Sequence, residues 1–201
     1  MWIRAKTGLA VFMMITIEAI GLAGMSSFLL WKSNIYDKEL KRTGMQSDII
    51  AEEVVCFPIA KQYINEIDYT DTYGADRENG IHSGCDLMDL KNEAGRIPVI
   101  SATDGVVTNL GWLYLGGYRI GITSDHHIYY YYAHLDSYAT NMHVGKEIKA
   151  GELLGFMGNT GEGEEGTEGK FDVHLHFGIY VNRDGNEETV NPYSYLKKVE
   201  Y

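Results

Sequence analysis

The sequence predicts an all-β domain, an antiparallel sheet or a half-open barrel, with an N-terminal transmembrane helix before it. The chain has 201 residues, with 23 glycines and 15 tyrosines against only 3 prolines. Aromatic residues favour strands and glycines favour turns, so this composition indicates short strands joined by tight turns. We divide the chain into a signal anchor at 1–32, a juxtamembrane stalk at 33–55 and a folded domain at 56–201.

Composition and charge exclude several classes of protein. Apolar residues make up 45% and charged residues 22% of the chain, which excludes a disordered protein. The formal net charge of -11 leaves no basic surface for nucleic acid, so we expect no nucleic-acid partner. Two cysteines are too few for a disulfide-built scaffold or a four-cysteine zinc site.

The membrane prediction rests on one apolar run from Gly8 to Trp31, interrupted only by the charge of Glu18. About 20 apolar residues cross a bilayer as a helix, whereas a cleaved signal peptide has an apolar region of about 7–15 residues. The run therefore predicts an uncleaved signal anchor that holds the protein in the membrane. Glu18 either faces a partner helix or is tolerated within a single span.

Basic residues flank both ends of this run, so the positive-inside rule does not choose an orientation. We place the folded domain outside the cytoplasm on the chemistry argued below. The segment 33–55 is charged and sparsely apolar, as expected for a stalk, and a helix is one form that it can take.

Short apolar segments and turn signals alternate through the folded domain. The expected strands are Pro98–Ala102, Gly105–Leu110, Arg119–Thr123, Ile128–His134 and Val173–Val181. A strand, a turn and a second strand are expected within 144–155, and a short closing helix within 191–201. This order predicts a mostly antiparallel arrangement.

Two histidines lie two residues apart in the last expected strand. Successive side chains of a strand point to opposite faces, so His174 and His176 share one face with Asp172. The opposite face is predicted to carry the apolar residues Val173, Leu175 and Phe177. An H-x-H pattern on a strand is a weak signal by itself, because a solvated face gives the same pattern.

A second pair combines a histidine with a carboxylate. His82 and Asp86 are four residues apart, and the intervening Ser83 and Gly84 favour a loop that folds the carboxylate back toward the imidazole. The alternative is a hydrogen-bonded pair in a turn.

The third element is a tyrosine-rich strand that ends at His134. Alternation along this strand places His134 in phase with Tyr130 and Tyr132. The alternative is that the tyrosines pack the sheet and His134 is structural.

Taken together, one carboxylate and two imidazoles complete the three-ligand set of a catalytic zinc ion, with a fourth position for water. At this point the sequence resembles the lysostaphin/LytM-type zinc metalloendopeptidases, which cleave peptide bonds in bacterial peptidoglycan. The H-x-x-x-D motif of that family matches His82 and Asp86, its H-x-H motif matches His174 and His176, and its A-H-L strand end matches 133–135. The wider resemblance runs from about residue 98 to residue 192.

The resemblance implies a role for each matched residue. It implies that His82, Asp86 and His176 bind one zinc ion and that His134 and His174 form the catalytic pair. Together with the apolar run, it predicts a membrane-anchored, extracytoplasmic endopeptidase whose substrate is a peptidoglycan peptide, with any membrane, division or sporulation partner unidentified. The alternative is a non-catalytic scaffold or activator of wall hydrolysis. Degenerate relatives of that kind lose ligands, and all five positions are intact here.

The sequence departs from the family pattern in an acidic loop before the H-x-H strand. The glutamates of this loop, Glu162, Glu164, Glu165 and Glu168, either select a cationic side chain of the stem peptide or are simply solvated. A G-x-G-x-x-G match at 161–166 lacks the flanking strand and helix of a dinucleotide site, which we reject. The 144–155 segment also looks like a biotinyl or lipoyl carrier domain, but no exposed lysine turn accompanies it.

A second departure is Cys85, next to the implied ligand Asp86. It is a buried filler, a stray metal ligand or a disulfide partner of Cys56. We favour the disulfide, which would close a loop of ~30 residues and contribute roughly 3–4 kcal/mol in an oxidising compartment.

Overall fold

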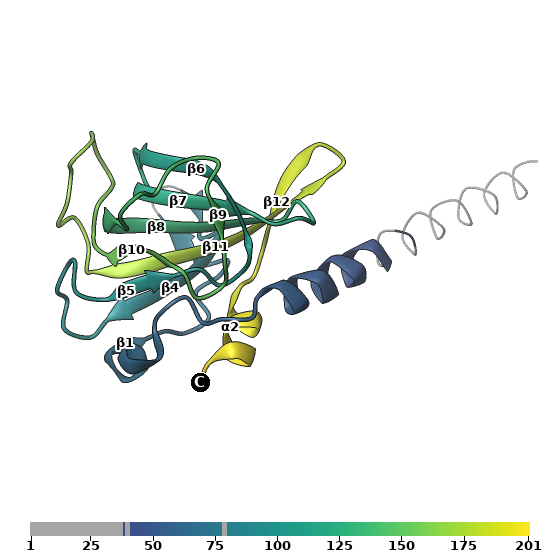
Figure 1. Ribbon diagram of the computed structural model, residues 1–201, viewed down its shortest axis with the longest axis horizontal. Coiled ribbons are helices and arrows are strands. Elements are labelled where there is room, and N and C mark those ends of the chain that lie inside the picture. The colour runs from purple at the N-terminus through teal and green to yellow at the C-terminus, as the bar shows by residue number, and fades with distance from the viewer. Residues whose placement is uncertain (1–37, 39–40, 78–79) are drawn as a thin grey trace, which may run out of the picture. The chain divides into compact units, whose positions relative to one another are not determined.

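The computed structural model describes residue 38 and residues 41–77 and 80–201 (Figure 1). The predicted signal anchor at 1–32, with Glu18, lies outside the described residues. Within the described part of the chain, no helix has the length and apolar character needed to cross a membrane. Residues 41–53, inside the expected stalk, are helical. The chain divides into two compact units, Met1–Asp48 and Ile49–Tyr201, and the second unit contains the sheet.

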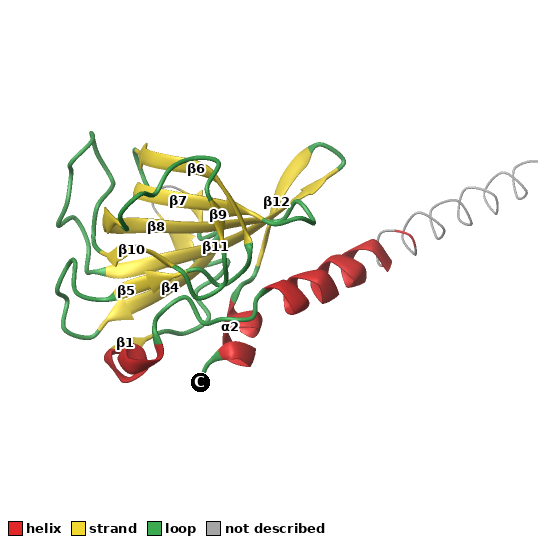
Figure 2. Cartoon of the chain, in the orientation of Figure 1, coloured by secondary structure: helices red, strands yellow, loops and turns green. Residues whose placement is uncertain are grey.

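The second unit is built on an antiparallel sheet of ten strands (Figure 2). The strands are β1 (Ile67–Asp68), β4 (Gly84–Asp89), β5 (Pro98–Ile100), β6 (Gly105–Leu113), β7 (Gly117–Thr123), β8 (Tyr129–Tyr138), β9 (Glu147–Ile148), β10 (Leu153–Met157), β11 (His174–Arg183) and β12 (Asn186–Val190). Their order is β1-β4-β11-β8-β7-β6-β9, with β10 paired to β5 and β8, and β12 paired to β11. The predicted antiparallel sheet is confirmed.

Three small elements complete the described fold. A separate two-stranded sheet joins β2 (Asp76–Arg77) to β3 (Gly80–Ile81). A 3-10 helix η1 (Lys61–Glu66) precedes β1, and helix α2 (Tyr193–Val199) lies at the C-terminal end, as expected. The five expected strands are all present, and the two strands expected within 144–155 appear as β9 and β10. These two do not pair with each other, because β9 pairs with β6 and β10 pairs with β5 and β8.

The loop expected between His82 and Asp86 is shorter than predicted, because strand β4 begins at Gly84. The carboxylate of Asp86 nevertheless lies beside the imidazole of His82, as expected. This strand pairs with β11 in a register that sets Asp86 opposite His176. A Cβ atom added at Gly84 would lie 2.5 Å from the Phe177 carbonyl oxygen, so the close approach of the two strands requires glycine there. The glycine that indicated a turn therefore serves strand packing.

The core lies on one face of β4, β8 and β11. Leu87, Tyr130, Leu175 and Phe177 are each fully buried, and Val173 is 1% exposed. The side chains of the H-x-H strand thus alternate as predicted, with the apolar residues inside and the histidines on the other face.

His134 departs from the alternation of its own strand, and the predicted phase with Tyr130 and Tyr132 is wrong. His134 has a φ of 62°, and the pairing of β7 with β8 shifts register in this region. Its backbone N–H donates to the Gly116 carbonyl at 2.8 Å. This irregularity reverses the side-chain direction, so the tyrosines remain in the core while His134 joins the histidine face. Positive φ in a non-glycine residue is unfavourable, so the surrounding structure must hold His134 in this conformation.

Candidate metal centre and active site

Three side chains converge between β4, β11 and the segment before β4. Nε2 of His82, Oδ1 of Asp86 and Nδ1 of His176 lie 3.0 Å from one another. Tetrahedral zinc ligands at about 2.0–2.1 Å from the ion lie about 3.3 Å apart, close to this triangle. Two imidazoles and one carboxylate are also a donor set that zinc accepts, so these residues fit a single divalent ion.

Neighbouring groups orient two of these side chains. The Thr72 carbonyl oxygen lies 2.8 Å from Nδ1 of His82, and because a carbonyl only accepts, Nδ1 carries the proton. Nε2 of His82 therefore presents its lone pair to the triangle. The other oxygen of Asp86, Oδ2, accepts a hydrogen bond of 2.6 Å from Nη2 of Arg77.

The ring of His176 is positioned by close packing. A Cβ atom at Gly84 would lie 2.7 Å from Cε1 and Nε2 of His176, so the ring occupies space that only glycine leaves free. The ring of Tyr131 lies edge-on to it, with the centroids 5.9 Å apart. Strand register and packing thus fix His176 opposite Asp86.

Asp86 is ionised within this cluster although it is only 8% exposed. Burial raises its pKa, but the neighbouring His176 and His82 outweigh burial and hold the pKa of Asp86 well below its usual range. An ionised carboxylate between two imidazoles is the state that a cation requires.

Two further histidines lie beside the triangle. The rings of His134 and His174 have centroids 4.6 Å apart, and Nε2 of His174 lies 3.8 Å from Oδ1 of Asp86. Nδ1 of His174 donates to the Asp172 carbonyl at 2.7 Å, and Nδ1 of His134 donates to the Thr160 carbonyl at 2.8 Å. Each ring therefore keeps an unprotonated Nε2.

Burial also keeps these two rings neutral. It lowers the pKa of His134 to about 3, and the neighbouring imidazoles of His174 and His176 act in the same direction. Burial lowers the pKa of His174 as well, although Asp86 opposes the shift. Two neutral imidazoles beside a candidate metal position are suited to accept and return a proton.

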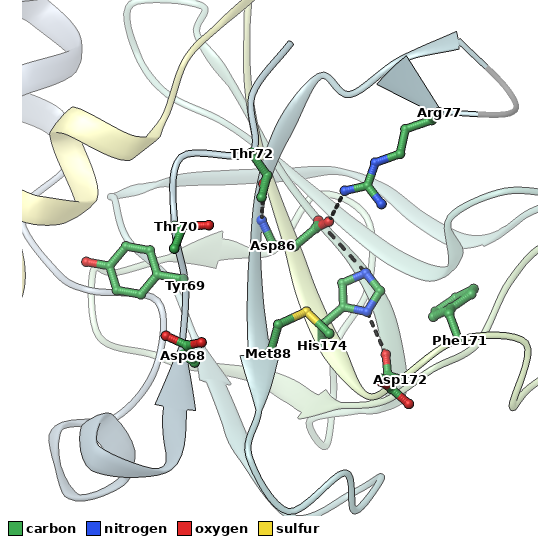
Figure 3. A pocket seen from close by; sticks show the side chains of 10 residues that line it. All are labelled: Asp68, Tyr69, Thr70, Thr72, Arg77, Asp86, Met88, Phe171, Asp172 and His174. Atoms are coloured by element: carbon green, nitrogen blue, oxygen red, sulfur yellow. Dashed lines mark hydrogen bonds and ion pairs between the residues drawn. The ribbon is translucent and has the colours of Figure 1, made fainter. Parts of the chain in front are cut away.

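A cavity of ≈ 270 Å³ opens beside Asp86 and His174 (Figure 3). Its other lining residues include Tyr69, Met88 and Phe171, which offer apolar surface. The cavity therefore gives room for part of a peptide next to His174.

The acidic loop packs elsewhere. The backbone N–H of Glu162 donates to the Leu115 carbonyl, and that of Gly163 donates to the Tyr114 carbonyl. Among the described residues that line the cavity, the acidic ones are Asp68, Asp86 and Asp172. The selection of a cationic side chain by the loop glutamates remains a prediction, and it would act outside this cavity.

The favoured Cys56–Cys85 disulfide is wrong, because both cysteines are free. Cys85 is fully buried on the core face, with Sγ 3.5 Å from the Thr70 carbonyl oxygen. Sγ of Cys56 lies 3.5 Å from the Phe57 carbonyl oxygen. Of the three alternatives, Cys85 is a buried residue that packs in the apolar core, since its side chain points away from Asp86 and the histidines.

The sequence profile of one family, described as peptidase family M23, matches residues 80–192, more than half of the chain. The chain belongs to peptidase family M23. The resemblance found from the motifs is thus confirmed, and the matched segment contains all five candidate site residues.

Curated relatives of this M23 chain include a named endopeptidase. It is 35% identical over 151 residues to the L-Ala--D-Glu endopeptidase of Bacillus subtilis (strain 168), covering 74% of this chain and 44% of the relative. It is 32% identical over 125 residues to lysostaphin of Staphylococcus simulans, covering 61% and 22%. The chain spans less than half the length of the curated relatives it matches.

Solved structures support the same M23 fold. A crystal structure from Ruminococcus gnavus ATCC 29149, assigned as a glycyl-glycine endopeptidase LytM, is 49% identical with a TM-score of 0.70, covering 75% of this chain and 62% of that one. The catalytic domain of lysostaphin from Staphylococcus simulans is 29% identical with a TM-score of 0.54, covering 69% and 98%. A chain of the SpoIIIAH–SpoIIQ complex, 16% identical with a TM-score of 0.53, shares the fold alone.

Sequence reasoning brought together the five candidate residues but missed the groups that orient them. Thr72, Arg77 and Thr160 contact site residues 9 to 26 positions away in the sequence. Two of the three contacts use backbone carbonyl oxygens. Every residue has one, so the residue type at these positions does not indicate the contact. Arg77 had a weak signal, as an arginine shortly before the H-x-x-x-D motif.

Proposed function

We propose that this protein is a membrane-anchored zinc endopeptidase that hydrolyses peptide bonds in cell-wall peptidoglycan. In this proposal His82, Asp86 and His176 hold one zinc ion, and His134 and His174 handle protons. The observation that carries it is the triangle of ligand atoms 3.0 Å apart beside two neutral imidazoles and a cavity.

The proposed chemistry follows from the state of each side chain. When bound, zinc supplies a Lewis acid and lowers the pKa of a coordinated water to about 7. His134 and His174, both unprotonated at Nε2, accept a proton from the attacking water and return it to the leaving amine. Their Nδ1–H groups are committed to the Thr160 and Asp172 carbonyls, which holds both rings in one tautomer.

The substrate and the location are supported from outside the site. Among the relatives named above, one is described as an L-Ala--D-Glu endopeptidase and one as an antimicrobial peptidase. Peptidoglycan lies outside the cytoplasm, so the proposal places 56–201 there, with 1–32 as the membrane anchor. The apolar run Gly8–Trp31 supports the anchor.

The test separates zinc binding from catalysis with two variants of the full chain. We expect about one equivalent of zinc in the parent chain, no retained zinc in His176→Ala, and retained zinc in His134→Ala. Hydrolysis of muropeptides should fall by about 10²–10⁴-fold in His134→Ala, because a positioned proton acceptor is lost. Zinc content is measured by metal analysis, and the cleaved bond is identified by mass spectrometry of released products.

The alternative is a non-catalytic scaffold or activator on the same fold. It predicts that any loss of turbidity of treated walls persists equally in both variants, with no new peptide termini. That result, or a parent chain that binds no zinc, would overturn the proposed enzyme.

A further inference from the structure

Arg77 and His82 are carried by the same small hairpin. Strands β2 and β3 pair Asp76 with Ile81 and Arg77 with Gly80, and His82 follows β3 directly. The hairpin is closed by hydrogen bonds of 2.9 Å from the His82 N–H to the Ala75 carbonyl and from the Gly74 N–H to the His82 carbonyl. One local structure therefore brings both an imidazole and a guanidinium to Asp86.

The two side chains of this hairpin contact different oxygens of the carboxylate. Oδ1 of Asp86 lies 3.0 Å from His82 and His176, within the triangle, whereas Oδ2 lies 2.6 Å from Nη2 of Arg77. In Figure 3 the guanidinium of Arg77 approaches the carboxylate from above, and the ring of His174 lies below it. Carboxylates can bind a metal through one or both oxygens. A guanidinium only donates and stays charged, so it keeps Oδ2 engaged as an acceptor.

We propose that Arg77 is a positioning residue whose guanidinium holds Asp86 to the metal through Oδ1 alone and so keeps one coordination position open. This inference rests on the proposed zinc site. Arg77 itself has a side chain 49% exposed, so burial does not force it to find a carboxylate partner. The side chain of Asp86 is only 10% exposed and offers two acceptors to a limited set of donors. The hydrogen bond from Arg77 thus satisfies an acceptor of the buried Asp86. Hydrogen bonding is a common way to orient a carboxylate that ligates a metal.

The experiment measures metal binding by the full chain without substrate. Zinc affinity is determined by competition with a chromogenic chelator, and cobalt(II) replaces zinc to report coordination through its visible spectrum. We expect zinc affinity to fall at least about tenfold in Arg77→Gln, in the range for loss of a ligand's hydrogen-bond partner. The cobalt spectrum should weaken and shift as a second carboxylate oxygen enters. Arg77→Lys keeps the charge but not the planar fork and should lie between these values.

The matched control is Arg183→Gln. Arg183 lies on β11 and pairs with Glu188 at 2.8 Å across the β11–β12 hairpin, so the variant loses the same charge and an ion pair away from the site. Its zinc affinity and cobalt spectrum should match the parent chain.

Two results would overturn the inference. One is a folded Arg77→Gln chain with the parent zinc affinity and cobalt spectrum. The other is a raised KM for muropeptides with unchanged metal binding, which would mean that Arg77, a cavity-lining residue, contacts substrate instead. If circular dichroism shows that Arg77→Gln is unfolded, Arg77→Lys decides on the same two readouts, and a parent-like result overturns the role of the guanidinium. A parent chain that binds no metal would instead overturn the proposed function.

Discussion

The two faces of strands β4 and β11 use one backbone for different purposes. Cys85, Leu87, Leu175 and Phe177 point to the core face and are fully buried. The alternate residues Asp86, His174 and His176 carry the carboxylate and two imidazoles. Asp86 and His174 also have hydrogen-bond partners outside these strands, Arg77 and the Asp172 carbonyl. The core face is therefore stabilised by packing within the sheet, whereas the site face depends on contacts from elsewhere in the chain. The comparison indicates that stability and metal chemistry can be altered separately.

The strongest test of this separation is Leu175→Ala, between His174 and His176. Leu175 is fully buried, so the truncation removes apolar contacts and leaves a cavity, at a cost of about 2–5 kcal/mol in unfolding free energy. We expect zinc content to stay at the parent value wherever the chain remains folded. Urea unfolding measures the first quantity and metal analysis the second.

A folded Leu175→Ala chain that loses zinc would show that the two faces are coupled. His176→Ala provides the reciprocal comparison, because it removes a metal ligand without opening a cavity in the core. The zinc-free forms of both variants should be compared, since bound metal itself adds to stability.

The same contrast explains what the sequence could and could not predict. The alternation of His174 and His176 with their apolar neighbours is a local property of a strand, and it was predicted correctly. The side-chain direction of His134 was predicted wrongly, because His134 itself has a φ of 62°, which reverses the direction. This backbone conformation is fixed by the hydrogen bond to the Gly116 carbonyl. Strand β4 was missed since Gly84 serves close packing against β11, a contact between segments about 90 residues apart.

Acid should lower the unfolding free energy of the zinc-free chain, and the effect should come from the histidines of the site face, since the apolar residues of the core face do not titrate. Unfolded His134 takes up a proton near pH 6.5, but burial keeps the folded residue neutral until pH falls to about 3. The unfolded state thus binds more protons between these values, so stability is lost as pH falls through this window. One proton corresponds to about 1.4 kcal/mol per pH unit. We expect His134→Asn to reduce the slope of unfolding free energy between pH 6 and 4.5 by about this amount.

Asparagine is chosen for this variant because it tolerates positive φ and does not titrate. The measurement is urea unfolding with a chelator present, across the same pH values for both chains. His174 contributes a slope of the same sign in both, since burial lowers its pKa too, and this contribution cancels in the comparison. Equal slopes would mean that His134 is protonated in the folded state and is not the neutral group that the proposed mechanism uses.

The smallest effect on stability is expected from adding a reductant, which acts on the two cysteines. Alkylation of their thiols also tests which face of the sheet Cys85 occupies. Both thiols are free, so adding a reductant should leave the midpoint of thermal unfolding unchanged. Burial raises the pKa of the Cys85 thiol to about 12, which suppresses its thiolate, whereas Cys56 is only partly buried. At pH 8 without reductant the folded chain should therefore take one alkyl label, at Cys56, and the unfolded chain two. A disulfide would leave both unlabelled, and a second label on the folded chain would mean that the residue beside Asp86 faces solvent, against the division between the two faces.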